Sequence, residues 1–429
     1  MAVAALRAMA EGRASKGVAH RAAGEPGPVV FVCGGHGSQW PHMGRELFDA
    51  SDAFRKTIEA CDAALAPHVG WSVQSVLRGI DGPDVPPIDR VDVVQPALFA
   101  MSLGLAAAWK AWGIRPDAVV GHSVGEIAAA VIAGALSLAD GARIVALRGR
   151  LIRRVAQGGG MLHIAQPAND VAPRLEAHAR KLSIAVINTP SSAVVSGCLG
   201  ALETLEQALV ADGVQSRRVN IAFAAHSPFM DPIVDELREA LEDLTPRPTE
   251  IPLYSSLSGA VVQGEHLDAA YWCRNVRDPV RFGETAAALA HDDFGVFIEL
   301  GGHPVLSEPL QHAVKHRPET VVVASARRNR GGLDALHTAV GQLHAAGHPV
   351  DWLAVGLPKP NTIARLPTYA FQRTRYWLEA PSSSTQPQDL GLSPTAHPLL
   401  STQTRLANRD AWMFSGRLNR ARLSWLSDH

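Results

Sequence analysis

The stretch Gly121-His122-Ser123-Val124-Gly125-Glu126 decides the fold of this chain. The apolar run at 118–120 predicts a β-strand before it, and the small residues at 127–133 predict an α-helix after it. The pattern G-x-S-x-G at such a junction is typical of a nucleophile elbow, whose glycines let strand and helix pack closely. The positive end of the helix would favour negative charge developing beside Ser123. The alternative is a glycine-rich turn with a serine that only caps the helix.

The composition excludes several classes of protein. The 429 residues suffice for more than one folded unit, and 47% hydrophobic against 19% charged residues allows a sizeable core. A formal net charge of −1 gives no reason to expect nucleic acid or an anionic membrane as a partner. No apolar run approaches the length of a membrane span, and we expect no signal peptide. Four scattered cysteines without a C-x-x-C pair suggest neither zinc nor disulfides and fit the cytoplasm.

The order of predicted elements divides the chain. Residues 1–27 look like a linker from a preceding domain, and 28–157 with 220–315 alternate strands and helices. Between these halves, 158–219 reads β-α-β-β-α-β, the ferredoxin-like arrangement. We therefore predict an α/β fold, with an α/β-hydrolase-like core that carries the elbow and an inserted ferredoxin-like (βαββαβ) subdomain.

The remaining residues follow a looser pattern. Strand and helix alternate again over 320–355, and 358–377 is irregular and aromatic. Residues 381–392 are rich in Ser, Gln and Pro, as flexible linkers are. The last 33 residues begin a new strand pattern.

A serine nucleophile needs a base, and His226 is the best candidate. It lies between a predicted strand end and a helix start, although a histidine that caps the next helix fits the same position. No carboxylate is clearly placed as a third member, because Asp231 is expected to serve the following helix. A Ser–His pair oriented by backbone groups would suffice.

Two further positions allow more than one interpretation. Arg148 lies in a predicted helix, either solvated or binding a substrate carboxylate through two hydrogen bonds, and its spacing does not decide between them. The glycine-rich loop at 34–39 lacks the Lys-Ser/Thr ending of a phosphate loop. It could instead provide a backbone amide near Ser123.

Six motifs stand out along residues 28–315. They are Val30-Phe31-Val32-Cys33-Gly34-Gly35-His36-Gly37-Ser38-Gln39-Trp40, Gln95-Pro96-Ala97-Leu98-Phe99, the elbow, Ala225-His226-Ser227-Pro228, the run from Tyr271 to Phe282, and His303-Pro304-Val305-Leu306. In sequence and in order they resemble the acyltransferase domain of modular type I polyketide synthases and, more distantly, malonyl-CoA:acyl-carrier-protein transacylases. The style of the chain also resembles the large synthases of mycobacterial phthiocerol-type lipids.

The resemblance implies roles for individual residues. Ser123 matches the acylated nucleophile, His226 its base, and Arg148 the arginine that pairs with the free carboxylate of a malonyl group. Backbone amides of His36 and Val124 match the oxyanion hole, although the family usually has Gln where this chain has His36. Asn275 and Arg281 match positions close to the histidine, where they could orient it.

The resemblance also implies a substrate and its pocket. The family loads a malonyl or methylmalonyl group, and the residue before the histidine tracks the size of that group. Ala225 leaves room for an α-methyl group. Phe223 occupies the position where the methylmalonyl branch of the family usually has Tyr, and the run 90–95 also resembles that branch. Val124 points instead to malonyl. We expect a slight preference for methylmalonyl.

The implied partners are acyl-CoA as donor and the phosphopantetheine arm of an acyl carrier protein as acceptor, with no bound cofactor and no metal. Residues 316–380 look like the family's post-acyltransferase linker region, and 381–396 like a flexible linker. Residues 397–429 resemble the truncated start of a dehydratase domain, with His429 where its catalytic histidine would fall. We therefore expect a piece of a larger synthase with neighbouring ketosynthase and dehydratase domains.

Two other functions remain open at this point. A serine hydrolase of the α/β-hydrolase class would use the same elbow, but it needs an acid partner for the histidine and has no need of Arg148. An inactive scaffold or docking domain is the other alternative, and the departure at His36 is its only support.

Overall fold

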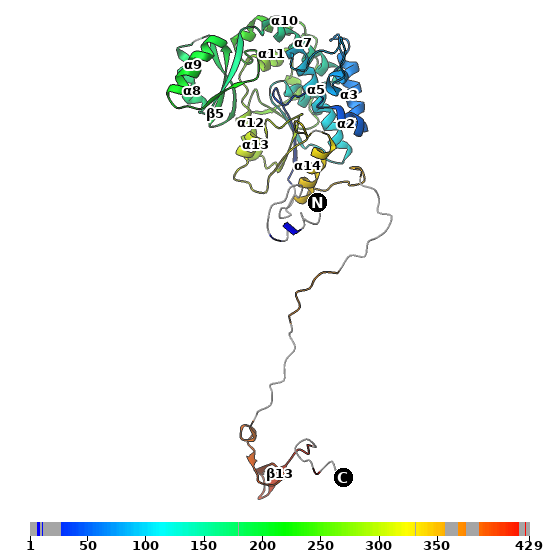
Figure 1. The fold of residues 1–429 in the computed structure, drawn as a ribbon, viewed down its shortest axis with the longest axis vertical. Coiled ribbons are helices and arrows are strands. Elements are labelled where there is room, and N and C mark those ends of the chain that lie inside the picture. Colours follow the sequence, from blue (N-terminus) through cyan, green and yellow to red (C-terminus); the bar gives the residue numbers. More distant parts are fainter. Residues whose placement is uncertain are drawn as a thin grey trace. The chain divides into compact units, whose positions relative to one another are not determined.

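The structure is a computed structural model that describes residues 7–8, 11, 27–178, 180–330, 332–356, 368–374, 386–419 and 425. The chain divides into two compact units, Met1–Lys359 and Pro360–His429. In the first unit, a core of strands and helices carries a smaller subdomain at one side (Figure 1). This arrangement confirms the predicted α/β class with its inserted subdomain.

A six-stranded sheet forms the centre of the first unit. Its order is β10-β9-β1-β2-β7-β8, in which β8 alone runs antiparallel to its neighbour. All five residues of β1 are buried, as expected for a parallel strand with both faces covered. The strands are β1 (Val29–Cys33), β2 (Ala118–Gly121), β7 (Leu253–Ser255), β8 (Ala260–Val262), β9 (Val296–Leu300) and β10 (Val321–Ala324).

The long helix α5 (Val91–Ala111) packs against α3 (Asp52–Leu65) and α7 (Leu138–Val155). In the described residues, α5 is the one helix long and apolar enough to cross a membrane by length and composition. However, 83% of its apolar window is buried inside the fold. A helix that is apolar all round is typical of a protein core, and the arrangement around α5 accounts for its composition.

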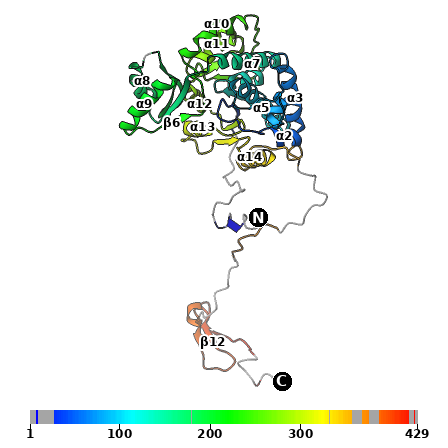
Figure 2. The ribbon, with the colours of Figure 1, turned by 45° about the horizontal axis from the view of Figure 1, so that its top comes forward.

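Further helices surround the sheet (Figures 1 and 2). They are α2 (Arg45–Ala50), α4 (Val73–Arg78), α6 (Gly125–Ile132), α10 (Asp231–Glu239), α11 (Ala269–Arg277), α12 (Phe282–His291), α13 (Ser307–Ala313) and α14 (Leu333–Ala345). Two short 3-10 turns, η1 (Pro228–Met230) and η2 (Gly264–His266), precede α10 and α11.

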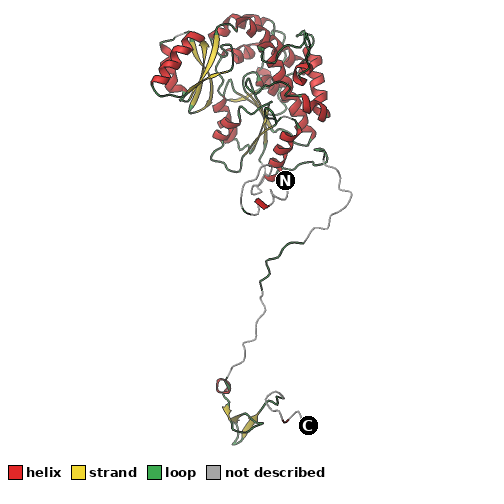
Figure 3. Cartoon of the chain, viewed as in Figure 1, coloured by secondary structure: helices red, strands yellow, loops and turns green. Residues whose placement is uncertain are grey.

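The inserted subdomain has the predicted β-α-β-β-α-β order. Its four strands pair antiparallel in the order β4-β5-β3-β6, and its helices lie on one side of the sheet (Figure 3). A separate apolar cluster fills the space between sheet and helices, which explains why the insert reads as a domain of its own. The elements are β3 (Gly159–Ile164), α8 (Ala168–Glu176), β4 (Leu182–Thr189), β5 (Ser192–Cys198), α9 (Leu199–Ala211) and β6 (Ser216–Val219).

The expected end of the core at residue 315 is too early. Strand β10 pairs with β9 as the edge strand of the main sheet, and α14 packs on β10. Leu336, Val340 and Leu343 of α14 are fully buried in the main core. The first part of the expected linker region therefore belongs to the core.

The second unit contains a small three-stranded antiparallel sheet in the order β11-β12-β13. Its elements are η3 (Pro387–Leu390), β11 (Ser393–Pro394), β12 (Thr402–Arg405) and β13 (Trp412–Ser415). The strand pattern expected at the end of the chain is present, while the dehydratase assignment stays a prediction. His429 and residues 357–367 and 375–380 of the expected linker region lie outside the described residues.

Candidate active site

The elbow has the strand–turn–helix form that its sequence predicts. Ser123 follows β2 and has φ +55°, in the left-handed region that non-glycine residues rarely adopt. A Cβ atom at Gly121 would lie 2.2 Å from the backbone nitrogen of Glu126, and one at Gly125 would lie 2.2 Å from the carbonyl oxygen of Cys33. Only glycine fits both positions, so the motif is fixed by the contact of α6 with the strand ends.

His226 contacts Ser123 directly. The Ser123 Oγ to His226 Nε2 distance is 2.7 Å, and both side chains are largely buried. His226 Nδ1 lies 2.9 Å from the carbonyl oxygen of Asp278, which can only accept. Nδ1 therefore carries the proton and Nε2 is free to accept the serine proton. A backbone carbonyl thus takes the place of the acid that the sequence lacked.

The charge state of His226 suits a base. Its pKa is lowered to about 3, mainly because burial disfavours the charged imidazole and secondly because Arg148 is positively charged. His226 is therefore neutral at neutral pH. Its backbone also has a positive φ, +56°, so both members of the Ser–His pair occupy the left-handed region.

Arg148 reaches the same point from α7. One guanidinium nitrogen donates to Gln95 Oε1 at 2.6 Å and the other to Ser123 Oγ at 3.2 Å. The side chain is buried, and although the charge of Glu126 acts on it through space, no carboxylate within the described ranges forms an ion pair with it. Its Nε atom is buried without a hydrogen-bond partner. Burial lowers its pKa to about 10, so the guanidinium remains a cation at neutral pH.

A buried arginine without an anionic partner is an anion receptor. Arg143 of the same helix provides the contrast, because it pairs with Asp243 on the surface. The sequence left a solvated helix arginine open for Arg148, and this structure excludes that alternative.

A small cavity of about 60 Å³ joins these residues at the junction of the core and the subdomain. Six of the residues singled out in the sequence line it. Val124, which was also expected in the specificity pocket, is not among the lining residues and is the N-cap residue of α6. The subdomain contributes Met161 and Val186 to the wall. The lining consists of His36, His122, Ser123, Arg148, Met161, Val186, Ile221, Phe223, Ala225 and His226.

The loop after β1 brings His36 to this cavity. A Cβ atom at Gly35 would lie 2.9 Å from the carbonyl oxygen of His122, so this loop packs directly on the elbow. The ring of His36 meets Phe223 edge to face, with centroids 5.5 Å apart. Burial lowers the pKa of His36 to about 3, aided by the charge of Arg148. Its Nε2 atom is buried without a partner.

Glu126 is a structural residue of the site that sequence reasoning missed. Its buried carboxylate accepts from the backbone amide and the hydroxyl of Ser256, from Leu257, from the Tyr271 hydroxyl at 2.6 Å and from Asn275 at 3.0 Å. Burial raises the pKa of Glu126, and these hydrogen bonds oppose the rise. The signal available in the sequence was a lone acid at the start of an otherwise apolar helix.

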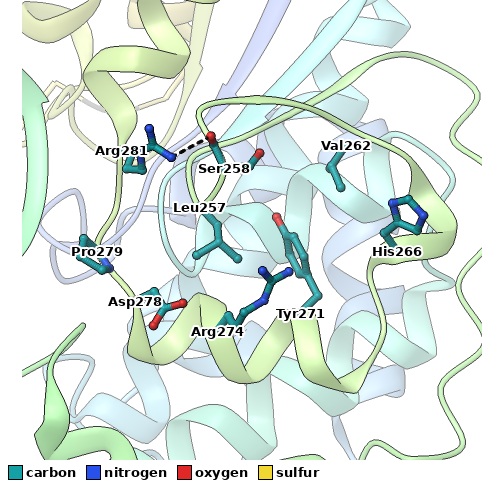
Figure 4. A pocket seen from close by; sticks show the side chains of 9 residues that line it. All are labelled: Leu257, Ser258, Val262, His266, Tyr271, Arg274, Asp278, Pro279 and Arg281. Carbon is teal, nitrogen blue, oxygen red and sulfur yellow. Dashed lines mark hydrogen bonds between the residues drawn. The ribbon is translucent and has the colours of Figure 1, made fainter.

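Asn275 and Arg281 do not orient His226 as expected. Asn275 donates to the backbone oxygen of Ser123 at 3.3 Å and to Glu126, so it supports the elbow instead. Arg281 pairs with Glu284 and donates to the carbonyl oxygen of Ser258 at 3.1 Å. Figure 4 shows it in a separate pocket of about 570 Å³ that Asp278 also lines. The run from Tyr271 to Phe282 does hold His226, but through the Asp278 carbonyl.

His122 of the elbow ties the core to the subdomain. Its Nε2 lies 3.0 Å from the side-chain oxygen of Asn188 in β4, and its ring contacts Phe282. Burial lowers its pKa to about 4. In the described residues, no three His, Cys, Asp or Glu side chains gather as metal ligands.

Comparisons with known proteins agree with this geometry. The family model described as the acyl transferase domain matches residues 30–350. The chain is 44% identical over 429 residues to polyketide synthase GfsB of Streptomyces halstedii, covering 99% of this chain but only 8% of that relative. It therefore spans a small part of such a protein.

Solved structures give the same result. The acyltransferase domain from module 8 of the salinomycin polyketide synthase is 42% identical, with a TM-score of 0.78 over 82% of this chain and 83% of that one. The acyltransferase domain of the polyketide synthase PpsC of Mycobacterium tuberculosis is less similar, at 33% identity and a TM-score of 0.65 over 75% and 97% of the two chains.

Proposed function

Because the chain belongs to the family of acyl transferase domains, we propose that it carries an acyl group on Ser123 between a coenzyme A thioester and a carrier thiol. The observation that carries this proposal is the Ser123–His226 contact of 2.7 Å beside an Arg148 without an anionic partner. A nucleophile, a neutral base and a cation then meet in one small cavity.

The first half-reaction forms an ester. Ser123 Oγ gives its proton to His226 Nε2 and attacks the thioester carbon, and the carbonyl oxygen becomes an oxyanion. The tetrahedral intermediate then collapses, the C–S bond breaks, and His226 returns the proton to the sulfur of coenzyme A. The Asp278 carbonyl stabilises the transient imidazolium through Nδ1–H.

The second half-reaction is the reverse with a new thiol. The carrier thiol gives its proton to His226 and attacks the ester carbon. The C–O bond breaks, and Ser123 Oγ recovers the proton. Neither half-reaction consumes a redox equivalent, and both use the same base in alternating directions.

Backbone amides of Val124 and His36 would receive the oxyanion. Val124 is the N-cap residue of α6, where amide groups lack helical partners. His36 lies in the loop that packs on the elbow. An amide donor does not depend on the side chain, so the change from the family's usual Gln to His36 leaves this role intact.

The acyl group we propose carries a free carboxylate, as malonyl and methylmalonyl groups do. Arg148 would pair with that carboxylate, and burial makes such a charge-assisted pair strong and selective. A simple acyl group leaves the guanidinium unpaired and is disfavoured.

Ala225 supports methylmalonyl over malonyl, because its small side chain lines the cavity and leaves space for a methyl group. One methyl group in a pocket is worth only about 1–3 kcal/mol, so the preference is expected to be partial. Replacing Ala225 with Phe should shift the ratio toward malonyl, and an unchanged ratio would remove this argument.

We also propose an acyl carrier protein as the source of the acceptor thiol, and ketosynthase and dehydratase domains as neighbours in a longer synthase. This chain spans only 8% of the GfsB relative, which supports one domain among many. The phosphopantetheine arm would belong to the carrier, so this domain needs no bound cofactor.

Intact mass spectrometry tests the proposal. The protein is mixed with equal malonyl-CoA and methylmalonyl-CoA, beside the Ser123→Ala variant. One malonyl-type adduct on the unaltered protein, absent from the variant, is the expected result and also identifies the acyl group. No adduct from either donor would contradict the proposed transfer.

A further inference from the structure

The cavity beside Ser123 contains a polar atom that the proposed mechanism does not use. The oxyanion hole needs only the backbone amide of His36, yet the ring of His36 also contacts Phe223, which lines the same cavity as His36 itself. The Nε2 atom of that ring is buried and makes no hydrogen bond. Native proteins keep few such atoms, because an unpaired buried polar group costs about 1–3 kcal/mol. Its position in an acyl pocket points to a ligand group as the missing partner.

The ring of His36 is held in place. It meets Phe223 edge to face at 5.5 Å, with an interplanar angle of 70°. The cavity is only about 60 Å³ and is also lined by Ser123 and Arg148. An acyl group attached to Ser123 would therefore occupy a space that His36 and Arg148 both border.

The charges decide which way the hydrogen bond runs. Burial and the cationic Arg148 lower the pKa of His36 to about 3, so the ring is neutral at neutral pH. A neutral imidazole can present either a donor or an acceptor at Nε2. Opposite an anion the donor tautomer is favoured, because two acceptors repel each other.

We propose that the Nε2–H of His36 donates a hydrogen bond to the carboxylate of the acyl group, so that His36 and Arg148 bind this carboxylate together. The inference rests on the proposed transfer of carboxylated acyl groups by Ser123. It makes His36 a substrate-binding residue through its side chain, in addition to its backbone amide.

Three substitutions separate the hydrogen bond from the shape of the ring. The amide nitrogen of His36→Gln can take the place of Nε2, that of His36→Asn takes the place of Nδ1, and His36→Phe keeps a ring against Phe223 without a donor. Acylation of Ser123 is timed by intact mass spectrometry with malonyl-CoA against acetyl-CoA, and with methylmalonyl-CoA against propionyl-CoA. The members of each pair differ only in the carboxylate.

The effect of each substitution is measured as a ratio of two acylation rates, for the donor pair whose carboxylated member the unaltered protein prefers. In His36→Phe and His36→Asn, the rate for the carboxylated donor divided by that for the plain donor should fall about tenfold or more, the range for a hydrogen bond to a charged group. His36→Gln should restore most of that ratio. His291→Gln, an exposed position, is the matched control.

An unchanged ratio in both the Phe and the Asn variants would overturn the role of His36 while leaving the Ser123 adduct intact. Absence of any adduct on the unaltered protein would instead contradict the proposed function. If the His36→Phe variant fails to fold, comparing His36→Gln with His36→Asn still tests the hydrogen bond. Both side chains are polar and differ by one methylene group, but only that of Gln can place a donor where Nε2 lies.

Discussion

At the scale of single residues, Ser123 and His226 share an unusual backbone. Both have positive φ angles, +55° and +56°, which cost side-chain-bearing residues about 1–3 kcal/mol each. The elbow contact and the hydrogen bonds of the buried Ser–His pair hold them there. The strained backbone at both reacting residues accompanies the placement of Ser123 Oγ and His226 Nε2 only 2.7 Å apart.

The carbonyl that orients His226 leads to the first prediction. Replacing Asp278 with Asn should leave acylation of Ser123 nearly unchanged, because the backbone oxygen and not the carboxylate accepts from Nδ1. In a Ser–His–Asp triad, the same change lowers kcat by about 10⁴. Asp231→Asn is the matched test of the other nearby carboxylate, which pairs with Arg277. A loss of that size in either variant would favour the hydrolase-type triad.

Arg148 provides the second prediction. Arg148→Ala should lower the rate with malonyl-type donors tenfold or more, since a hydrogen bond to a charged group contributes about 1.5–3 kcal/mol. Turnover of acetyl-CoA should be retained or increased. Arg143→Ala, which breaks only a surface ion pair on the same helix, is the control. Rates come from single-turnover acylation followed by mass spectrometry. Undiminished malonyl transfer in Arg148→Ala would refute its assigned role.

At the scale of elements, the first turn of α6 is joined to α11 through Glu126. The carboxylate accepts bonds from Tyr271 and Asn275 of α11 and from the loop after β7. Asn275 then reaches the backbone oxygen of Ser123. The position of the nucleophile thus depends on a buried polar network as well as on the tight glycine turn.

Glu126→Gln tests that network. An amide group presents two hydrogens where the carboxylate accepts, so buried donors would face donors and the free energy of unfolding should fall by about 2 kcal/mol or more. Denaturant unfolding measures the change. Glu236→Gln, an exposed helix carboxylate paired with Arg154, should stay within about 0.5 kcal/mol. Equal stability of the two variants would mean that the network contributes little.

The sequence predicts local elements better than distant contacts. The elbow and the order of the ferredoxin-like insert follow from short patterns of apolar and glycine residues. The Asp278 carbonyl could not be predicted, because a backbone acceptor leaves no residue signature. Arg148 remained ambiguous until its helix neighbours were placed, since helical spacing does not reveal which face is buried.

The sequence predicts a strand and a helix over 320–355 but assigns them to the linker region and not to the main core, for a related reason. Strand β10 is only four residues long, and α13 separates it from β9 along the chain. Its sequence therefore does not reveal that it pairs with β9. A chain ending at 315 should therefore lose cooperative thermal unfolding, because it exposes β9 as an edge and removes the buried face of α14. A chain ending at 359 is the control. Cooperative melting of the shorter chain would contradict the extended boundary.

At the scale of the whole molecule, three histidines of the active site link stability to pH. The pKa values of His36 and His226 are lowered to about 3 and that of His122 to about 4. The unfolded chain takes up a proton at each near pH 6.5, whereas the folded protein does not. The stability that these neutral side chains contribute is therefore fully present above pH 6.5 and is lost progressively as pH falls, toward about 4 for His122 and about 3 for the other two.

The size of this loss is the last prediction. Each histidine should lower the free energy of unfolding by about 1 kcal/mol when the pH falls from 7 to 5.5. Denaturant unfolding at the two pH values measures the total. His36→Gln removes one of the three groups and should reduce the loss by about one group's share, whereas His291→Gln, on the surface, should leave it unchanged. An identical loss with and without His36 would mean that its imidazole is charged, or exposed, in the folded protein, which would also undermine it as a neutral donor beside Arg148.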